Sequence, residues 1–441
     1  MMGGFGWLSV ARLGLVQACL GAIVVMTTST LNRVMVVELA LPALLPGLLV
    51  AMHYVVQVVR PRMGYGSDMG QRRTPWIVGG MAVLGVGGAL AAVATAWMGS
   101  DRVAGITLAV FAFALIGVGV SASGTSLLVL LASQVDAPRR AGAATLVWLM
   151  MIAGFAITAG LAGKLLDPYS PLRLVAVTVA VSVITMVITL LATWRLEGAA
   201  ASAPIAAPAT GRKPSFRNAL AQVWAEPVAR RFTIFVFISM LAYSAQDLIL
   251  EPFAGSVFGF TPGESTSLSG VQHGGVLLGM LAAALAGRGR RFGSLRAWQI
   301  GGCLMSALML MGLVAAAVVG PVWPFKATVF GLGAANGAFS IAAIASMMRL
   351  ASEGQHAREG VRMGLWGAAQ AVAFGMGGLV GTGARDLARW LIGTPSTAYA
   401  AVFALEAALF VVAAVLAARL NGSHTAVARN EIRPSVHGVT A

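Results

Sequence analysis

Charged residues and cysteines are scarce in this chain of 441 residues. Only 10% of the residues are charged and 58% are hydrophobic, and the mean hydropathy of +0.84 is typical of a chain embedded in lipid. The two cysteines, Cys19 and Cys303, lie in apolar runs, which argues against a disulfide framework. The sequence also lacks a phosphate-binding glycine loop and zinc-ligand spacing. We therefore expect a membrane protein with no catalytic residues and no metal site of its own.

Long apolar runs follow one another along most of the chain. A membrane-spanning helix needs about 20 mostly apolar residues. Twelve segments qualify: 13–37, 42–59, 76–98, 103–132, 143–165, 171–194, 232–252, 266–287, 297–319, 325–348, 364–384 and 397–418. The first run is longer than a signal-peptide core, so we expect it to remain in the protein. The expected fold is all-α, with twelve transmembrane helices.

Most of the 30 basic residues fall on one side of this predicted arrangement. Both termini and the turns after every second span are rich in arginine, as in the pair Arg72 and Arg73 and the pair Arg139 and Arg140. Because basic loops stay in the cytoplasm, both termini are expected there. The net charge of +15 is then a result of topology, and we expect no binding to nucleic acid.

The chain divides near its middle. The predicted parts are a six-helix half at 1–196, a cytoplasmic linker at 197–231, a second six-helix half at 232–420 and a cytoplasmic tail at 421–441. The linker begins with a stretch of Ala, Pro, Gly and Ser that is too poor in large apolar residues to pack. Its end, from Phe216 to Trp224, fits either a short helix on the membrane surface or an irregular loop. The stretches after Gly117 and Gly331 look like copies, which predicts two six-helix pseudo-repeats.

One turn resembles a known superfamily. In "GYGSDMGQRR" the residues Gly64, Asp68, Arg72 and Arg73 match the loop between the second and third spans of the major facilitator superfamily. Gln71 occupies the place of the second glycine of that motif. The resemblance implies that Asp68 and Arg72 form a latch between the cytoplasmic ends of the two halves. The alternative is a solvated turn that only obeys the charge rule.

Three longer stretches resemble one group within that superfamily. The fourth span lacks the arginine, and the fifth the Gly-Pro element, that proton-coupled drug exporters usually carry. Instead, "LNRVMVVELALPA", "RPRMGYGSDMGQRRTPWIVGG" and "AYSAQDLILEPFAG" look like the PucC/LhaA group of photosynthetic bacteria, and the likeness extends from about Leu13 to Ala417. That group comprises light-harvesting complex assembly factors and proposed bacteriochlorophyll delivery proteins.

The resemblance implies a location and partners. The location would be the cytoplasmic membrane or the intracytoplasmic photosynthetic membrane. The partners would be antenna light-harvesting polypeptides, the core photosynthetic complex, lipids and pigment-synthesis enzymes. The cofactor would be bacteriochlorophyll.

The first and seventh spans each carry a polar cluster. The members are Asn32, Arg33 and Glu38 in one span, and Gln246, Asp247 and Glu251 in the other. Ionisable groups in a membrane tend to face the bundle interior in pairs, so Arg33 could face Asp247 across the two halves. Alternatively, Arg33 and Glu38 extend to the headgroups, or they contact polar groups of a ligand.

Two histidines occupy equivalent spans, the second and the eighth. A neutral imidazole can bind a coordinatively unsaturated metal such as the magnesium of a chlorin. His53 and His273, with Gln272 beside the latter, are therefore candidate pigment-binding residues. The glycines after His273 would leave room for a flat ring. The other interpretation is a histidine that is hydrogen-bonded to a neighbouring helix.

Three functions remain open at this level. The first is an assembly factor that binds bacteriochlorophyll and delivers it to antenna polypeptides. The second is a secondary active transporter of a small amphipathic solute, with Glu38, Asp247 and Glu251 as candidate ion-coupling carboxylates. The third is a scaffold that binds no pigment.

Overall fold

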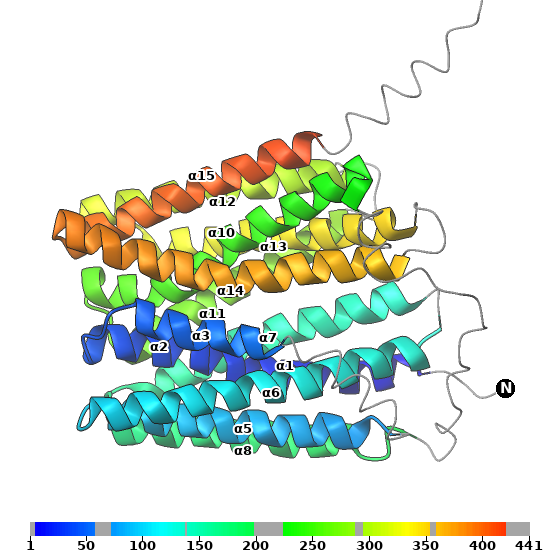
Figure 1. The fold of residues 1–441 in the computed structure, drawn as a ribbon, viewed down its shortest axis with the longest axis horizontal. Helices are drawn as coiled ribbons and strands as arrows, with labels where there is room; N and C mark the ends of the chain where they lie inside the picture. Colours follow the sequence, from blue (N-terminus) through cyan, green and yellow to red (C-terminus); the bar gives the residue numbers. More distant parts are fainter. Residues whose placement is uncertain are drawn as a thin grey trace, which may run out of the picture.

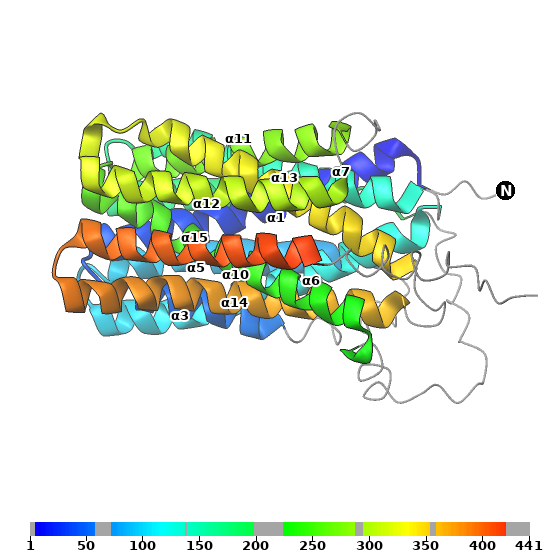
Figure 2. The same cartoon turned by 90° about the horizontal axis from the view of Figure 1, so that it is seen from above.

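In the computed structural model, the described residues are 5–57, 72–136, 139–197, 224–286, 294–352 and 359–419. Every regular element within these ranges is a helix. The helices lie roughly parallel to one another in an elongated bundle (Figure 1). α1 begins and α15 ends toward the same end of the bundle, the right-hand end in Figures 1 and 2.

The N-terminal half begins with a helix that changes its winding twice. α1 (Trp7–Val25) continues through the π-helical turn η1 (Met26–Thr30), α2 (Leu31–Arg33) and a second π-helical turn, η2 (Val34–Glu38). The following helices are α3 (Leu44–Val56), α5 (Thr74–Trp97), α6 (Arg102–Gln134), α7 (Arg140–Leu166) and α8 (Pro171–Thr193). The C-terminal half contains α10 (Pro227–Phe258), α11 (Pro262–Ala286), α12 (Leu295–Val319), the 3-10 turn η5 (Gly320–Val322), α13 (Phe325–Ser352), α14 (Glu359–Ile392) and α15 (Pro395–Arg419).

Ten helical segments of the described chain are long and apolar enough to cross a membrane. The described part of α3 has only 13 residues, and α14 has 34 residues but carries Arg385, Asp386 and Arg389 near its end. The protein is thus an all-helical, multi-pass membrane protein. The total of twelve crossings stays a prediction.

Helix ends follow local rules that can be read in the sequence. Asp101 and Ser294 accept hydrogen bonds from backbone N–H groups in the first turns of α6 and α12. Ser170 does the same for α8, whose first residue is Pro171. Gly259 ends α10 with φ of 70°, a left-handed conformation that glycine adopts without a steric penalty.

Each half has its own apolar core, and a smaller cluster joins the two. One large cluster draws almost all its members from residues 10–196, and the other lies within 232–417. The small cluster comprises Met151 and Ile152 of α7, Val276, Met280 and Ala283 of α11, and Ala338 and Ile341 of α13. Between the halves, α7 packs on α11 and α3 packs on α14.

Glycines allow neighbouring helices to approach at backbone distance. A Cβ at Gly80 of α5 would lie 2.5 Å from the backbone nitrogen of Ser123 in α6, and a Cβ at Gly279 of α11 would collide with the carbonyl oxygen of Ala334 in α13. Apolar side chains gain little by association in lipid, so membrane helices depend on such close packing. These contacts fix the helix neighbours within each half.

The contact of α11 with α13 gives a prediction about stability. Gly279→Leu should lower the stability of the protein by about 1–3 kcal/mol or more, because the added side chain forces the two backbones apart. Gly301→Leu on α12 is the matched control, since a Cβ there meets no atom within 4 Å. Thermal unfolding of the detergent-solubilised variants measures the difference. Equal melting temperatures would contradict the packing argument.

Candidate functional site

Arg33 and Glu38 form an ion pair at one end of the bundle. The Arg33 Nη1 atom lies 2.5 Å from Glu38 Oε1, and Arg33 is only 2% exposed. Residues five apart in an α-helix point about 140° away from each other. The π-helical turn η2 is wider, and its i to i+5 pattern appears in the hydrogen bond from the Leu39 N–H to the Val34 carbonyl. This turn brings Glu38 to the side of the helix on which Arg33 lies.

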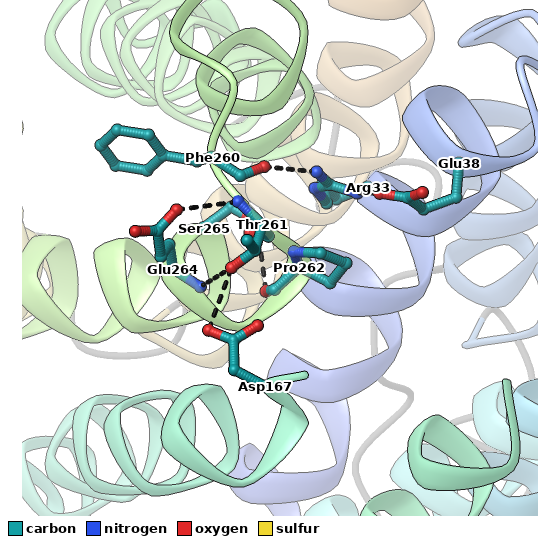
Figure 3. Close-up of polar contacts among 8 residues, drawn as sticks. All are labelled: Arg33, Glu38, Asp167, Phe260, Thr261, Pro262, Glu264 and Ser265. Atoms are coloured by element: carbon teal, nitrogen blue, oxygen red, sulfur yellow. Dashed lines mark hydrogen bonds and ion pairs between the residues drawn. The ribbon is translucent and has the colours of Figure 1, made fainter. Parts of the chain in front are cut away.

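The same guanidinium joins the two halves. Its Nη2 atom donates to the carbonyl oxygen of Phe260, 2.5 Å away, in the connection between α10 and α11 (Figure 3). The carbonyl is available because α10 has ended at Gly259. Gly255 provides the space, since a Cβ at that position would lie 2.9 Å from Arg33 Nη2. Arg33 therefore lies directly against the backbone of α10.

A second contact between the halves lies beside the first. Thr261 and Glu264 form a reciprocal capping box at the start of α11, with distances of 2.9 and 3.1 Å (Figure 3). The Thr261 hydroxyl also donates to Asp167 Oδ2 of the N-terminal half, 3.0 Å away. Nearby, burial raises the pKa of Tyr169, Glu38 raises it further, and Arg33 lowers it. Tyr169 thus lies within the electrostatic reach of the ion pair.

Further hydrogen bonds close this end of the interface. Hydroxyl pairs join Ser29 to Ser269 and Thr30 to Thr266, each at 3.0 Å. Asn32 donates its amide N–H to the Leu248 carbonyl at 2.6 Å, and the backbone N–H of Leu44 donates to Asp386 Oδ2 at 2.8 Å. The two halves are therefore held together at the end where Arg33 lies.

The hypothesis that Arg33 pairs with Asp247 is wrong, because the carboxylate that Arg33 binds is that of Glu38. Arg33 does not extend to the headgroups either, since it is 2% exposed. Glu38 is 35% exposed and does reach the surface. Asp247 instead lies close to Gln272 of α11. Contact of these side chains with a ligand stays a hypothesis.

Several buried polar groups near this interface have no hydrogen-bond partner within the described residues. Among them are both carboxylate oxygens of Glu251 and of Glu406 and both polar atoms of the Gln246 amide. All three side chains are at most 2% exposed. Glu251 lies near the Ser29 and Ser269 hydroxyls, and Glu406 of α15 lies within the electrostatic reach of Asp247. A charge that is buried without a partner is costly, so Glu251 and Glu406 are unusual residues within these helices.

The two candidate histidines differ in their hydrogen bonds. The Nδ1 atom of His273 lies 2.8 Å from the Ser269 carbonyl oxygen, which can only accept. Nδ1 therefore carries the proton, and the lone pair of Nε2 is available to a metal. In His53 the Nε2 atom is itself bonded to Gln57 Nε2 at 2.9 Å. The amide N–H of Gln57 donates, so the lone pair of His53 Nε2 is occupied.

The expectation that the glycines after His273 leave room for a flat ring agrees with the structure at Gly274 but not at Gly275. Gly275 packs against the Phe330 carbonyl oxygen of α13, and Gly279 packs against that of Ala334. A Cβ at Gly274, in contrast, would meet no atom within 4 Å. The open space beside His273 is therefore confined to Gly274.

The predicted cytoplasmic latch falls only partly within the described residues. Gly64 and Asp68 lie outside them. At the start of α5, the Glu197 carboxylate accepts hydrogen bonds from the backbone N–H groups of Arg73 and Thr74, at 2.9 and 2.7 Å. A carboxylate is favourable at the positive end of a helix. This contact joins the end of α8 to the start of α5 within one half, and the latch between halves stays a prediction.

Two solved transporter structures share the fold of this chain. A D-xylose–proton symporter superposes with a TM-score of 0.68 at 14% identity, over 94% of this chain and 97% of the symporter. The nucleoside transporter NupG superposes with a TM-score of 0.67 at 15% identity, over 94% of this chain and 100% of NupG. The chain therefore has the fold of the major facilitator transporters.

The sequence identifies the family within this fold. The model of the family described as "PUCC protein" matches residues 30–425, and the chain belongs to this family. It is 54% identical over 412 residues to the "Bacteriochlorophyll synthase 44.5 kDa chain" of Rhodobacter capsulatus, over 93% of this chain and 95% of that protein. It is 30% identical over 434 residues to "Protein PucC" of the same organism, over 93% and 91% of the two chains. The resemblance read from the three sequence stretches is thereby confirmed.

Some residues of the site were not anticipated from the sequence. Glu406, an acid within the last apolar run, could have been flagged because ionisable residues are rare inside membrane spans. The capping box at Thr261 and Glu264 is likewise readable as the pattern T-x-x-E. Gly255 and the Phe260 carbonyl gave no such signal, because their role depends on where Arg33 lies.

The ion pair predicts an energetic coupling. In a double-mutant cycle with Arg33→Gln and Glu38→Gln, the two effects on stability should be non-additive by about 1–2 kcal/mol, because either substitution alone already removes the ion pair. A parallel cycle with Arg33→Gln and Asp247→Asn should be additive within about 0.5 kcal/mol. Unfolding of the purified variants measures both cycles. A larger coupling to Asp247 than to Glu38 would contradict the arrangement described here.

Proposed function

We propose that this protein binds bacteriochlorophyll during the assembly of bacterial light-harvesting complexes and delivers it to antenna polypeptides. Membership of the PUCC family supports a role in photosynthetic membranes, and the name of one relative contains the pigment. The observation that carries the pigment-binding step is His273, whose Nδ1 is bonded to a carbonyl and whose Nε2 is available. The proposed partners are antenna polypeptides, the core photosynthetic complex, pigment-synthesis enzymes and lipids.

The proposed location is the cytoplasmic or intracytoplasmic photosynthetic membrane. Two six-helix halves would cross it twelve times, with both termini and the linker at 197–231 in the cytoplasm. The arginine-rich turns support this orientation. It also agrees with the position of the start of α1 and the end of α15 at one end of the bundle.

The donor atoms around His273 fit a chlorin magnesium. The hydrogen bond to the Ser269 carbonyl orients the imidazole and makes it a better ligand, so the Nε2 atom of His273 would hold the magnesium of a chlorin. The Phe155 ring lies against the imidazole with centroids 5.0 Å apart, so one neighbour of the imidazole is an apolar ring. In this proposal the protein binds and hands over pigment and is not an enzyme, although one relative is named a synthase chain.

The proposal predicts a phenotype for loss of the protein. Deletion from a photosynthetic host should lower the near-infrared antenna absorbance of the membranes while pigment synthesis continues, because the polypeptides would lack a source of bound pigment. Absorbance spectra of membranes and of extracted pigment measure the two effects separately. Antenna absorbance at the parental level in the deletion strain would reject the proposal.

The two histidines predict different results on substitution. His273→Leu should strongly reduce the ratio of chlorin absorbance to polypeptide in the purified protein, while the amount of protein stays near normal. His53→Leu should leave this ratio largely unchanged, because His53 Nε2 already binds Gln57. If His273 is only structural, its loss should instead cost about 0.5–1.5 kcal/mol of stability, because the buried hydrogen bond from Nδ1 to the Ser269 carbonyl is removed. That result would appear as less protein at an unchanged pigment ratio.

A secondary transporter of a small amphipathic solute is the second candidate. The buried and unpartnered carboxylates of Glu251 and Glu406 favour it, because such groups can bind and release protons. The fold alone does not decide, since it is shared by transporters of different solutes. Proton movement into proteoliposomes that depends on an added solute and is lost in Glu251→Gln would favour transport. Absence of such movement, together with bound pigment, would favour the assembly factor.

A further inference from the structure

α7 and α11 face each other along one side of the interface between the halves. We call their contact the α7–α11 seam. Near the end where Arg33 lies, the seam is closed by backbone contact. A Cβ at Gly163 would lie 2.6 Å from the backbone nitrogen of Ser267, and a Cβ at Gly270 would lie 2.9 Å from that of Gly160. No flat ring can lie between the helices at this level.

Further along, the same seam is filled by large apolar side chains. Met151 and Phe155 of α7 lie in one cluster with Val276 and Met280 of α11. Methionine is unbranched and polarizable, and it adapts readily to irregular shapes. This part of the seam can therefore repack around an apolar guest, in contrast to the backbone contact at the glycines.

His273 stands at the transition between these two parts. The Phe155 ring meets the imidazole edge-on, with an interplanar angle of 87°. The next residue is Gly274, beside which there is open space. Val271 and Leu278, three residues before and four after Gly274, are 36% and 52% exposed and mark the outer face of α11. Successive residues are about 100° apart on a helix, so the imidazole lies one step around α11 from the lipid.

We propose that a magnesium chlorin enters this site sideways from the bilayer, through the α7–α11 seam, over Gly274 and with displacement of Phe155, to reach the Nε2 atom of His273. This inference rests on the proposed function of pigment binding and adds the route and the number of sites. A chlorin carries a long apolar tail and dissolves in lipid, so a lateral route spares it any passage through water. The tail can stay among the acyl chains while the ring lies in the seam.

Within the described residues, the opposite side of the interface does not offer a second site of this kind. There α3 packs on α14, and the residue that follows His53 is Tyr54 rather than a glycine. The centroid of the Tyr54 ring lies 4.5 Å from that of the His53 imidazole and 5.9 Å from that of the Phe374 ring in α14. Next to His53, the Tyr54 side chain thus stands at the sequence position that corresponds to Gly274 next to His273. One pigment for each chain is therefore the expected stoichiometry.

The test uses the full chain in lipid nanodiscs, with bacteriochlorophyll a as the probe added from lipid vesicles. Gly274→Leu should weaken binding about tenfold or more, because its side chain fills the entrance. Gly301→Leu on the outer face of α12 is the matched control, as both glycines face open space. Phe155→Ala should raise the rate of association severalfold by removing the displaced ring. Shifts of the long-wavelength chlorin band and quenching of tryptophan fluorescence report binding, and thermal melting reports folding.

The outcomes separate this inference from the proposed function. Wild-type binding that is equally strong in Gly274→Leu, or an unchanged association rate in Phe155→Ala, would overturn lateral entry and leave pigment binding intact. If Gly274→Leu melts at a much lower temperature than Gly301→Leu, the Phe155→Ala rate decides. No binding by the wild-type protein would overturn both. A stoichiometry of two that falls to one in His53→Leu would overturn the single site.

Discussion

A guanidinium removed from water must find hydrogen-bond acceptors, and much of one end of this protein is arranged to supply them to Arg33. Its partners come from different parts of the chain, the Glu38 carboxylate and the Phe260 carbonyl. The first requires the π-helical turn η2, and the second requires α10 to end at Gly259. Leaving such a charge without partners would cost several kcal/mol. The irregular winding of the first helix and the closed interface between the halves thus both serve to supply hydrogen-bond acceptors to Arg33.

Closure at this end also depends on the absence of side chains. The halves meet where Gly255 admits the guanidinium and where Gly163 and Gly270 allow α7 and α11 to touch. In a membrane, contact at backbone distance replaces the hydrophobic driving force that operates in water. Because the small residues are confined to part of each helix, the seam is tight near Arg33 and is filled by deformable side chains beyond His273. The distribution of glycine thus decides which part of the seam is closed by backbone contact and which part is filled by larger side chains.

The helices could be predicted from the sequence, but the partners of Arg33 could not. Hydropathy placed most of the helices within a few residues of their observed bounds, because the requirement for about 20 apolar residues leaves little freedom. The pairing of Arg33 with Glu38 was not predicted, because residues five apart in an α-helix point about 140° away from each other. No feature of residues 34 to 38 predicts the π-helical turn that brings them together. The difference between the histidines was readable in principle. His53 has Gln57 one turn later, where His273 has Leu277, and Tyr54 stands where His273 has Gly274.

The closed end also separates the mechanical requirements of the two candidate functions. A transporter that exposes its central cleft to both sides must break the contacts of Arg33 with Phe260 and of Thr261 with Asp167 in every cycle. The Arg33–Phe260 contact is part-buried, so its repeated rupture needs compensation from a bound solute or proton, whereas the Thr261–Asp167 contact is exposed. Both carboxylate oxygens of Glu251 lack a hydrogen-bond partner in the described part of the chain. Glu251 lies one helical turn before Gly255, which packs against Arg33, so its carboxylate is placed to offer Arg33 an alternative partner. A pigment that enters through the seam at Gly274 makes no such demand, because the contacts near Arg33 can stay intact while the ring binds and leaves. The proposed lateral entry is therefore compatible with a transporter fold that is closed at the end where Arg33 lies.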